Sequence, residues 1–91
     1  MILASIIEKE SGNDSERAII SSVLHNRLRD NMRLQADPTV IYGITKGKGS
    51  LGRRLLKSDL KKSSVYNTYM IDGLPKTPIC NPGEASLLAC L

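Results

Sequence analysis

The sequence contains no tryptophan and no phenylalanine, and its only aromatic residues are three tyrosines, Tyr42, Tyr66 and Tyr69. Aliphatic side chains must therefore fill any core. A chain of 91 residues makes one domain or part of one, and it buries only about 60–65% of its unfolded surface, so the core is small. No apolar run approaches the roughly 20 residues that span a bilayer. No basic segment of the kind that opens a signal peptide is visible either.

Cysteine and histidine are also scarce. Two cysteines, Cys80 and Cys90, lie ten residues apart, and no Cys-x-x-Cys or mixed Cys/His set is present. The usual zinc-ligand patterns are thus missing, and we expect no metal site. A disulfide between Cys80 and Cys90 stays open, although two small half-buried thiols fit the pattern better. His25 is the only histidine and has polar neighbours, so we expect a solvated or hydrogen-bonded side chain rather than a catalytic one.

The positive charges are unevenly distributed. The formal net charge is +4, and seven of the thirteen basic residues lie between Lys46 and Lys62, opposed only by Asp59. A small nucleic-acid-binding module is one interpretation. The lysines, however, lie among glycines without interleaved aromatic residues, and no recognition helix stands out. A solvated loop is the favoured interpretation, and we expect no nucleic-acid partner.

Hydrophobic spacing predicts a mainly α-helical chain. The first helix presents one stripe of side chains, made of Leu3, Ile6, Ile7 and Glu10. Gly12 supplies a stop signal for this helix. A second helix follows closely, with Asn13 and Glu16 at the spacing of a capping box, and should fade near Asn31. The short connection predicts a helix hairpin.

The rest of the chain predicts short helices separated by loops. The segment ADPTVIYG, residues 36–43, predicts a third helix with Asp37 as its cap and Gly43 just past its end. One or two helical turns are expected in residues 55–62, turns in 63–83, and a final helix in 83–91. A short β-hairpin near Leu34–Gln35 or in 63–79 is kept as an α+β alternative.

Glu10 is the candidate with the clearest chemical meaning. It lies one turn beyond Ile6 and Ile7, so a packed stripe would carry its carboxyl into low-dielectric surroundings and raise its pKa. A carboxyl that is protonated near neutral pH is what a general acid needs. The alternative is a terminal glutamate that bends into water or pairs with Arg17 or Arg27.

Several longer motifs resemble one known family. The segments ASIIEKES, NRL, LQADPTVIYG and YNTYMIDGLPKTPICNPGEASL resemble the MltG/YceG-like family of endolytic murein transglycosylases, from Ala4 to about Leu88. The family's catalytic glutamate is the second acid of its EKE segment, which is Glu10 here, and Ser11 completes a Glu-Ser pair. The resemblance implies a lysozyme-like arrangement, with Glu10 at the bend of the helix hairpin beside a loop-rich substrate wall.

The resemblance also implies the chemistry. Protonated Glu10 would donate its proton to the glycosidic oxygen between N-acetylmuramic acid and N-acetylglucosamine. The muramic 6-hydroxyl would then attack its own C1 with Glu10 as the base, which leaves a 1,6-anhydromuramyl end. Most glycosidases need two carboxylates, whereas an internal nucleophile removes that need. Glu8 points to another side of the helix and is not expected to help.

Other site residues follow from the same motifs. Gln35, Asn67 and Tyr69 are expected to line the glycan groove, Tyr42 to stack on a sugar face, and Ser11 to contribute beside the acid. Asn67 alternatively closes a turn. No cofactor is expected. The label aminodeoxychorismate lyase, which proteins of this family have carried, implies pyridoxal phosphate, but no convincing cofactor lysine with a phosphate cradle is visible.

The resemblance finally sets expectations for partners and location. Peptidoglycan strands are the expected partner, together with cell-wall synthases, and full-length family members are anchored in the bacterial inner membrane and face the periplasm or cell exterior. Residues 1–91 are expected to be part of the catalytic domain, without the membrane anchor, the preceding substrate-binding domain and the C-terminal end, and so to be soluble. An inactive or glycan-binding remnant is the alternative function. Exposed apolar residues 87–91 are expected to favour homo-oligomers.

Overall fold

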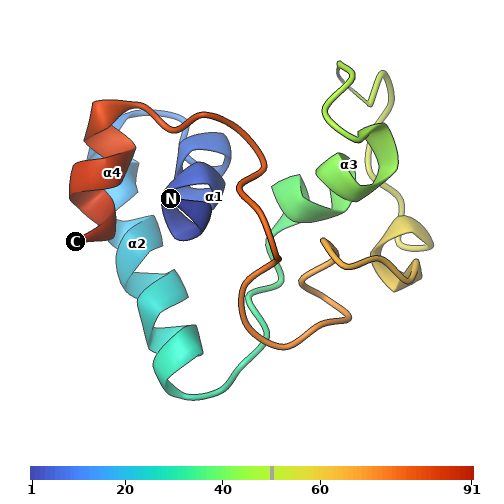
Figure 1. Ribbon diagram of the computed structural model, residues 1–91, viewed down its shortest axis with the longest axis horizontal. Coiled ribbons are helices and arrows are strands. Elements are labelled where there is room, and N and C mark those ends of the chain that lie inside the picture. Colours follow the sequence, from blue (N-terminus) through green and yellow to red (C-terminus); the bar gives the residue numbers. More distant parts are fainter. Residues whose placement is uncertain (50) are drawn as a thin grey trace.

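The computed structural model describes residues 1–49 and 51–91. In chain order the helices are α1 (Ile2–Glu10), α2 (Asp14–Arg29), α3 (Asp37–Thr45), the short 3-10 helix η1 (Asp59–Lys61) and α4 (Glu84–Cys90). Figure 1 shows α1, α2 and α4 grouped on the left, α3 on the right, and the loop after η1 passing between them. The mainly α prediction is confirmed. No strand occurs in the described residues, so the α+β alternative and the short β-hairpin are wrong.

The predicted helix hairpin is formed by α1 and α2. The Asn13 side chain accepts a hydrogen bond from the Glu16 amide at 3.2 Å, and the Glu16 carboxylate accepts one from the Gly12 amide at 2.9 Å. The first contact satisfies an amide that a helix start leaves without a partner, and the second binds the residue before the N-cap to the first turn of α2. The capping signal read from the sequence is therefore confirmed, and α2 ends at Arg29, two residues before the expected Asn31.

A small aliphatic core is built from residues of α1, of α2 and of two loop segments. Its buried members are Leu3, Ile6, Ile7, Leu24, Leu34, Ala36 and Ile79. The apolar stripe of α1 is thus buried as predicted. Helix α4 packs against both α1 and α2 and closes one side. His25 Nε2 donates to the Cys90 carbonyl oxygen at 2.7 Å, which confirms a hydrogen-bonded histidine. Cys80 and Cys90 are free thiols.

Helix α3 differs from its prediction at both ends. Ala36 is the N-cap, without a capping side chain, and Asp37 is the first helical residue, so the prediction of Asp37 as the cap is wrong. The helix also continues past Gly43 to Thr45. A Cβ at Gly43 would lie 2.8 Å from the Ser64 hydroxyl. This glycine therefore permits close packing of the 64–66 segment and does not end the helix.

The basic stretch is organised around one buried carboxylate. Asp59 accepts two hydrogen bonds from Arg53, at 2.8 and 3.1 Å, and one from the Leu56 amide at 2.8 Å. These bonds, led by the one from Arg53, hold the pKa of Asp59 well below its usual range. The predicted helical turn in 55–62 is confirmed as η1. No helix in the described parts of the chain combines the length and apolarity needed to cross a membrane.

Candidate active site

Glu10 is the last residue of α1, where the buried stripe reaches the surface. The residue as a whole is exposed, so the expectation that the stripe carries it into the interior holds only in part. Neighbouring atoms nevertheless remove enough water from the carboxyl to raise its pKa, and the negative charge of Asp37 adds to this increase. Both effects favour the protonated form that a general acid needs.

No basic side chain in the described part of the chain neutralises Glu10. Arg17 lies 3.7 Å from the Glu8 carboxylate and donates to the Ser86 hydroxyl at 3.1 Å. Arg27 donates to the Leu34 carbonyl oxygen at 2.6 Å. The alternative in which Glu10 pairs with Arg17 or Arg27 is therefore not what the structure shows.

Glu8 has the opposite environment, although it is only two residues away. Its carboxylate accepts hydrogen bonds from the Gly83 amide at 2.8 Å and the Ser86 hydroxyl at 3.0 Å, both at the start of α4. These bonds, the Gly83 amide first, lower the pKa of Glu8. The environment of Glu8 stabilises its charged form, whereas the environment of Glu10 favours its protonated form. Such a difference between neighbouring carboxylates is typical of one structural group and one acid. Glu8 thus attaches α4 to α1.

Asp37 and Tyr69 form the second part of the site. The Tyr69 hydroxyl donates to the Asp37 carboxylate at 2.6 Å. Desolvation raises the pKa of Tyr69 to about 12, helped by the Asp37 hydrogen bond and by the charges of Asp37 and Glu10. Three acidic groups from α1, α3 and the 63–83 loop therefore influence one another. Sequence reasoning predicted Glu10 and Tyr69 but missed Asp37, because an aspartate before proline at a helix start is usually a cap.

Gln35 lies beside Glu10 in the link between α2 and α3, and its backbone is strained. Its φ is +51°, a left-handed conformation that is uncommon for residues other than glycine. The Gln35 amide donates to the Thr68 carbonyl oxygen at 3.2 Å. Its exposed side chain lines a hollow of about 250 Å³ together with Glu10 and Arg27. The structure thus brings Gln35 and Glu10 together, while glycan contact by Gln35 stays a prediction.

Asn67 is buried, and backbone groups occupy its side chain. The amide nitrogen donates to the carbonyl oxygens of Leu60 at 3.0 Å and Lys62 at 2.6 Å, and the amide oxygen accepts from the Tyr69 amide at 2.9 Å. This is the geometry of the turn-closing alternative, and it orients Tyr69. Substrate contact by Asn67 stays a prediction.

A buried pair of threonines fixes the same loop against α3, and sequence reasoning missed it. The Thr68 hydroxyl accepts from the Ala36 amide at 2.8 Å and lies 2.8 Å from the Thr39 hydroxyl, which donates to the Ala36 carbonyl oxygen at 2.7 Å. Threonines at 39 and 68 give no local signal, because their partners come together only in the fold. Their network fixes Tyr69 relative to Asp37.

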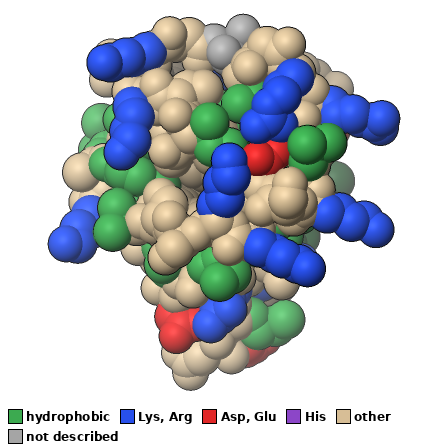
Figure 2. All heavy atoms as spheres, turned by 90° about the vertical axis from the view of Figure 1, so that its right-hand side faces the viewer, with side chains coloured by type: hydrophobic (Ala, Val, Ile, Leu, Met, Phe, Trp, Pro, Cys, Tyr) green, Lys and Arg blue, Asp and Glu red, His purple; other side chains and the backbone are tan. Residues whose placement is uncertain are grey.

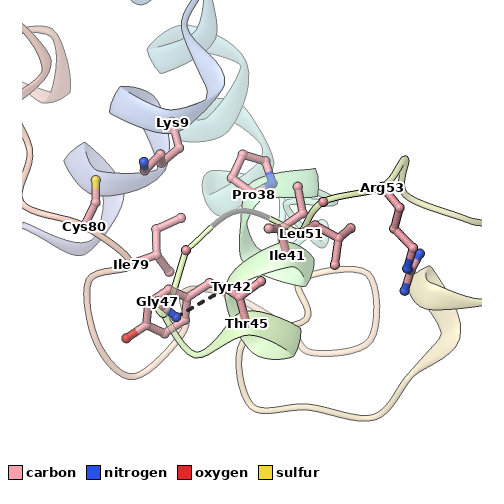
Figure 3. A pocket seen from close by; sticks show the side chains of 12 residues that line it. Lys9, Pro38, Ile41, Tyr42, Thr45, Gly47, Leu51, Arg53, Ile79 and Cys80 are labelled. Atoms are coloured by element: carbon pink, nitrogen blue, oxygen red, sulfur yellow. Dashed lines mark hydrogen bonds between the residues drawn. The ribbon is translucent and has the colours of Figure 1, made fainter.

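Tyr42 and Ser11 lie on the borders of the site. Tyr42 packs edge-on against Tyr66, with ring centroids 4.7 Å apart, and lines a separate cavity of about 740 Å³. Figure 3 shows Tyr42 in that cavity below Pro38. The Ser11 hydroxyl donates to the Ile7 carbonyl oxygen at 2.7 Å, which satisfies the end of α1. Sugar contacts by Tyr42 and Ser11 stay predictions.

The described residues present many basic side chains on one face and contain no cluster that could hold a metal ion. Lys and Arg side chains dominate the face that Figure 2 presents, which is the right-hand side of Figure 1, where the basic stretch of residues 46–62 lies. Within residues 1–49 and 51–91, no three His, Cys, Asp or Glu side chains are gathered as a metal ion requires.

A profile of the YceG-like family matches residues 1–91. The chain belongs to the YceG-like family. This YceG-like chain is 44% identical over 91 residues to an endolytic murein transglycosylase of Bacillus subtilis (strain 168), covering 100% of this chain and 24% of that relative. It is 31% identical over 87 residues to an endolytic murein transglycosylase of Streptococcus pneumoniae serotype 2, covering 90% of this chain and 15% of that one.

The fold agrees with a solved member of the same family. A crystal structure of a YceG-like protein from Listeria monocytogenes has a TM-score of 0.87 to this chain at 44% sequence identity, covering 98% of this chain and 28% of the other. The chain therefore spans about a quarter, or less, of the length of the curated relatives it matches. Those relatives carry the name of a murein-cleaving enzyme.

Proposed function

We propose that this chain cleaves the glycosidic bond between N-acetylmuramic acid and N-acetylglucosamine in peptidoglycan and leaves a 1,6-anhydromuramyl end. The supporting observation is the pair of environments in α1. Glu10 has no counter-ion in the described part of the chain and a raised pKa, whereas Glu8 is held as an anion by α4. A carboxyl with a raised pKa that borders a hollow is suited to protonate a leaving oxygen.

The reaction uses Glu10 twice. Its carboxyl proton passes to the glycosidic oxygen as the C1–O bond breaks, and positive charge develops at C1 of the muramic ring. The resulting carboxylate then accepts the proton of the muramic 6-hydroxyl while that oxygen bonds to C1. The carboxyl ends the cycle protonated, so no second carboxylate, metal or cofactor is needed for the balance.

Asp37 and Tyr69 have supporting roles in this scheme. The Asp37 carboxylate favours the proton on Glu10 before reaction and stabilises the positive charge that later develops on the sugar. The hydrogen bond from the Tyr69 hydroxyl fixes that carboxylate in place. Gln35, beside Glu10 in the same hollow, offers an amide that can bind a sugar acetamido group.

Digestion of purified murein tests the proposal. The parent chain should release muropeptides lighter by one water than hydrolytic products, as detected by liquid chromatography and mass spectrometry. Glu10→Gln keeps the shape of the side chain without the acid and should abolish that product. Glu84→Gln, which changes an exposed acid in the first turn of α4, is the matched control and should leave product formation unchanged.

Other outcomes separate the alternatives. Binding of murein without any product favours the glycan-binding remnant. Reducing muramic ends would contradict the transglycosylase step and favour hydrolysis, with Asp37 as the second carboxylate that hydrolytic glycosidases use. Full activity of Glu10→Gln would remove Glu10 from the reaction altogether.

A further inference from the structure

A second hollow, separate from the one that Glu10 lines, is not used by the chemistry above. It measures about 740 Å³ and opens between the end of α1, the outer face of α3 and the Gly-rich loop after it. Figure 3 shows Lys9 and Cys80 on one side of this cavity and Leu51 and Arg53 on the other. Lys9 directly precedes Glu10, and the lining residue Pro38 directly follows Asp37. Glu10 itself lines a separate hollow, so a substrate bound at Glu10 reaches this cavity only through a substituent that extends past Lys9 or Pro38.

The apolar part of the walls suits aliphatic side chains. Most of the surface is apolar, with Pro38, Ile41, Leu51 and Ile79 among the lining residues. The Thr45 hydroxyl already accepts from the Gly47 amide at 3.3 Å. A sugar ring presents several hydroxyls that such walls leave without partners, which costs free energy. Short aliphatic amino-acid side chains incur no such cost, whereas the N–H and C=O groups of the peptide backbone still need partners or water.

The charge at the cavity mouth selects an anion. Lys9 and Arg53 are the cations among the described lining residues, and no carboxylate is among them. Arg53 is already bound through two nitrogens to Asp59. Lys9 is exposed and has no ion-pair partner in the described chain. Burial raises the pKa of the Cys80 thiol, the charge of Lys9 lowers it and the charge of Glu8 raises it, so both charged groups act on this end of the cavity.

We propose that this cavity binds the acidic peptide carried by the muramyl unit, with Lys9 pairing a peptide carboxylate. The proposal rests on the proposed function, because it takes a peptide-substituted glycan as the substrate. It makes Lys9 a specificity residue that distinguishes peptide-bearing strands from bare ones, and it leaves the proton chemistry to Glu10.

Binding measurements test the pairing without any turnover. In the Glu10→Gln background, calorimetry compares muramyl dipeptide with its analogue in which the free carboxylate is a carboxamide. The acid should bind about fivefold more tightly, the contribution of a good solvent-exposed ion pair. Lys9→Met should bind both probes equally. Lys57→Met, which removes an exposed cation outside this cavity, should keep the preference.

Thiol protection gives a second readout that needs no substitution at Lys9. Cys80 lines the cavity whereas Cys90 lies at the end of α4, and both are free and half-buried. Muramyl dipeptide should slow alkylation of Cys80 by iodoacetamide at alkaline pH and leave the rate at Cys90 unchanged, as followed by mass spectrometry.

Two results would overturn the peptide site. One is equal binding of acid and carboxamide to the Glu10→Gln protein, and the other is unchanged alkylation of Cys80 at saturating dipeptide. Neither depends on cleavage. A chain that fails to cut murein yet shows the carboxylate preference therefore refutes the proposed reaction and not this site.

Discussion

At the scale of single residues, two glutamates of α1 lie in environments that shift their pKa values in opposite directions. Glu8 accepts hydrogen bonds that stabilise its negative charge, whereas Glu10 is partly desolvated and faces the charge of Asp37. The difference arises from the desolvation of Glu10 and from contacts made by residues 37, 83 and 86, which are far from α1 in the sequence. Proton affinity in this site is therefore a property of the fold and not of the EKE segment alone.

Thermal stability should report these environments separately. Because the pKa of Glu8 is lowered from its ordinary 4.5, Glu8 stabilises the fold above that pH, and the contribution is lost as pH falls through the folded pKa. Glu8→Gln should lower Tm at neutral pH and flatten its acid dependence. Because the pKa of Glu10 is raised, charging it costs stability as pH rises, so Glu10→Gln should keep or raise Tm at neutral pH. Equal losses in both variants would contradict these assignments.

Asp37 should control the pH range of the activity. Desolvation is the larger cause of the raised pKa of Glu10, and Asp37→Asn removes the second cause, the like charge, so the alkaline limb of the rate profile should move to lower pH. Tyr69→Phe removes the hydroxyl but keeps the Asp37 charge, and its alkaline limb should stay at or above that of the parent. An alkaline limb that is unchanged in Asp37→Asn would contradict the coupling between the two carboxylates.

At the scale of elements, local signals predicted where helices form but not always where they end. The Asn13 and Glu16 cap is written in adjacent residues and was predictable. The extension of α3 beyond Gly43 was not, because Gly43 serves a contact with Ser64 that exists only in the folded chain. The stripe that ends at Glu10 depends on spacing within one helix and was visible in the sequence. The roles of Asp37 and Glu8 depend on contacts between distant segments and were not visible.

The threonine network should be the main attachment of the 63–83 loop to α3. Thr68→Val keeps the shape but leaves the Ala36 amide without its acceptor in a buried place, and should cost about 1–3 kcal/mol of unfolding free energy. Thr77→Val removes an exposed hydroxyl and should cost less. Urea denaturation of both variants measures the difference in unfolding free energy. Equal losses would show that the buried Thr68 hydroxyl stabilises the fold no more than an exposed hydroxyl.

At the scale of the whole molecule, α4 leaves apolar surface in solvent. Leu87 and Leu88 are exposed by 38% and 62%, as the sequence predicted for this segment. We predict self-association that increases with concentration, because contiguous exposed apolar surface favours burial against a second copy. Leu88→Glu should yield a monomer in size-exclusion chromatography with light scattering. A parent chain that stays monomeric at all concentrations would contradict the prediction.

The most direct test of the account is a titration of the glutamates by carbon-13 NMR, with each carboxyl carbon assigned by single Glu→Gln substitutions. The account predicts a midpoint above 4.5 for Glu10 and below 4.5 for Glu8. It also predicts that Asp37→Asn moves the Glu10 midpoint down. A Glu10 carboxyl that titrates at or below its ordinary value would contradict its role as the proton donor.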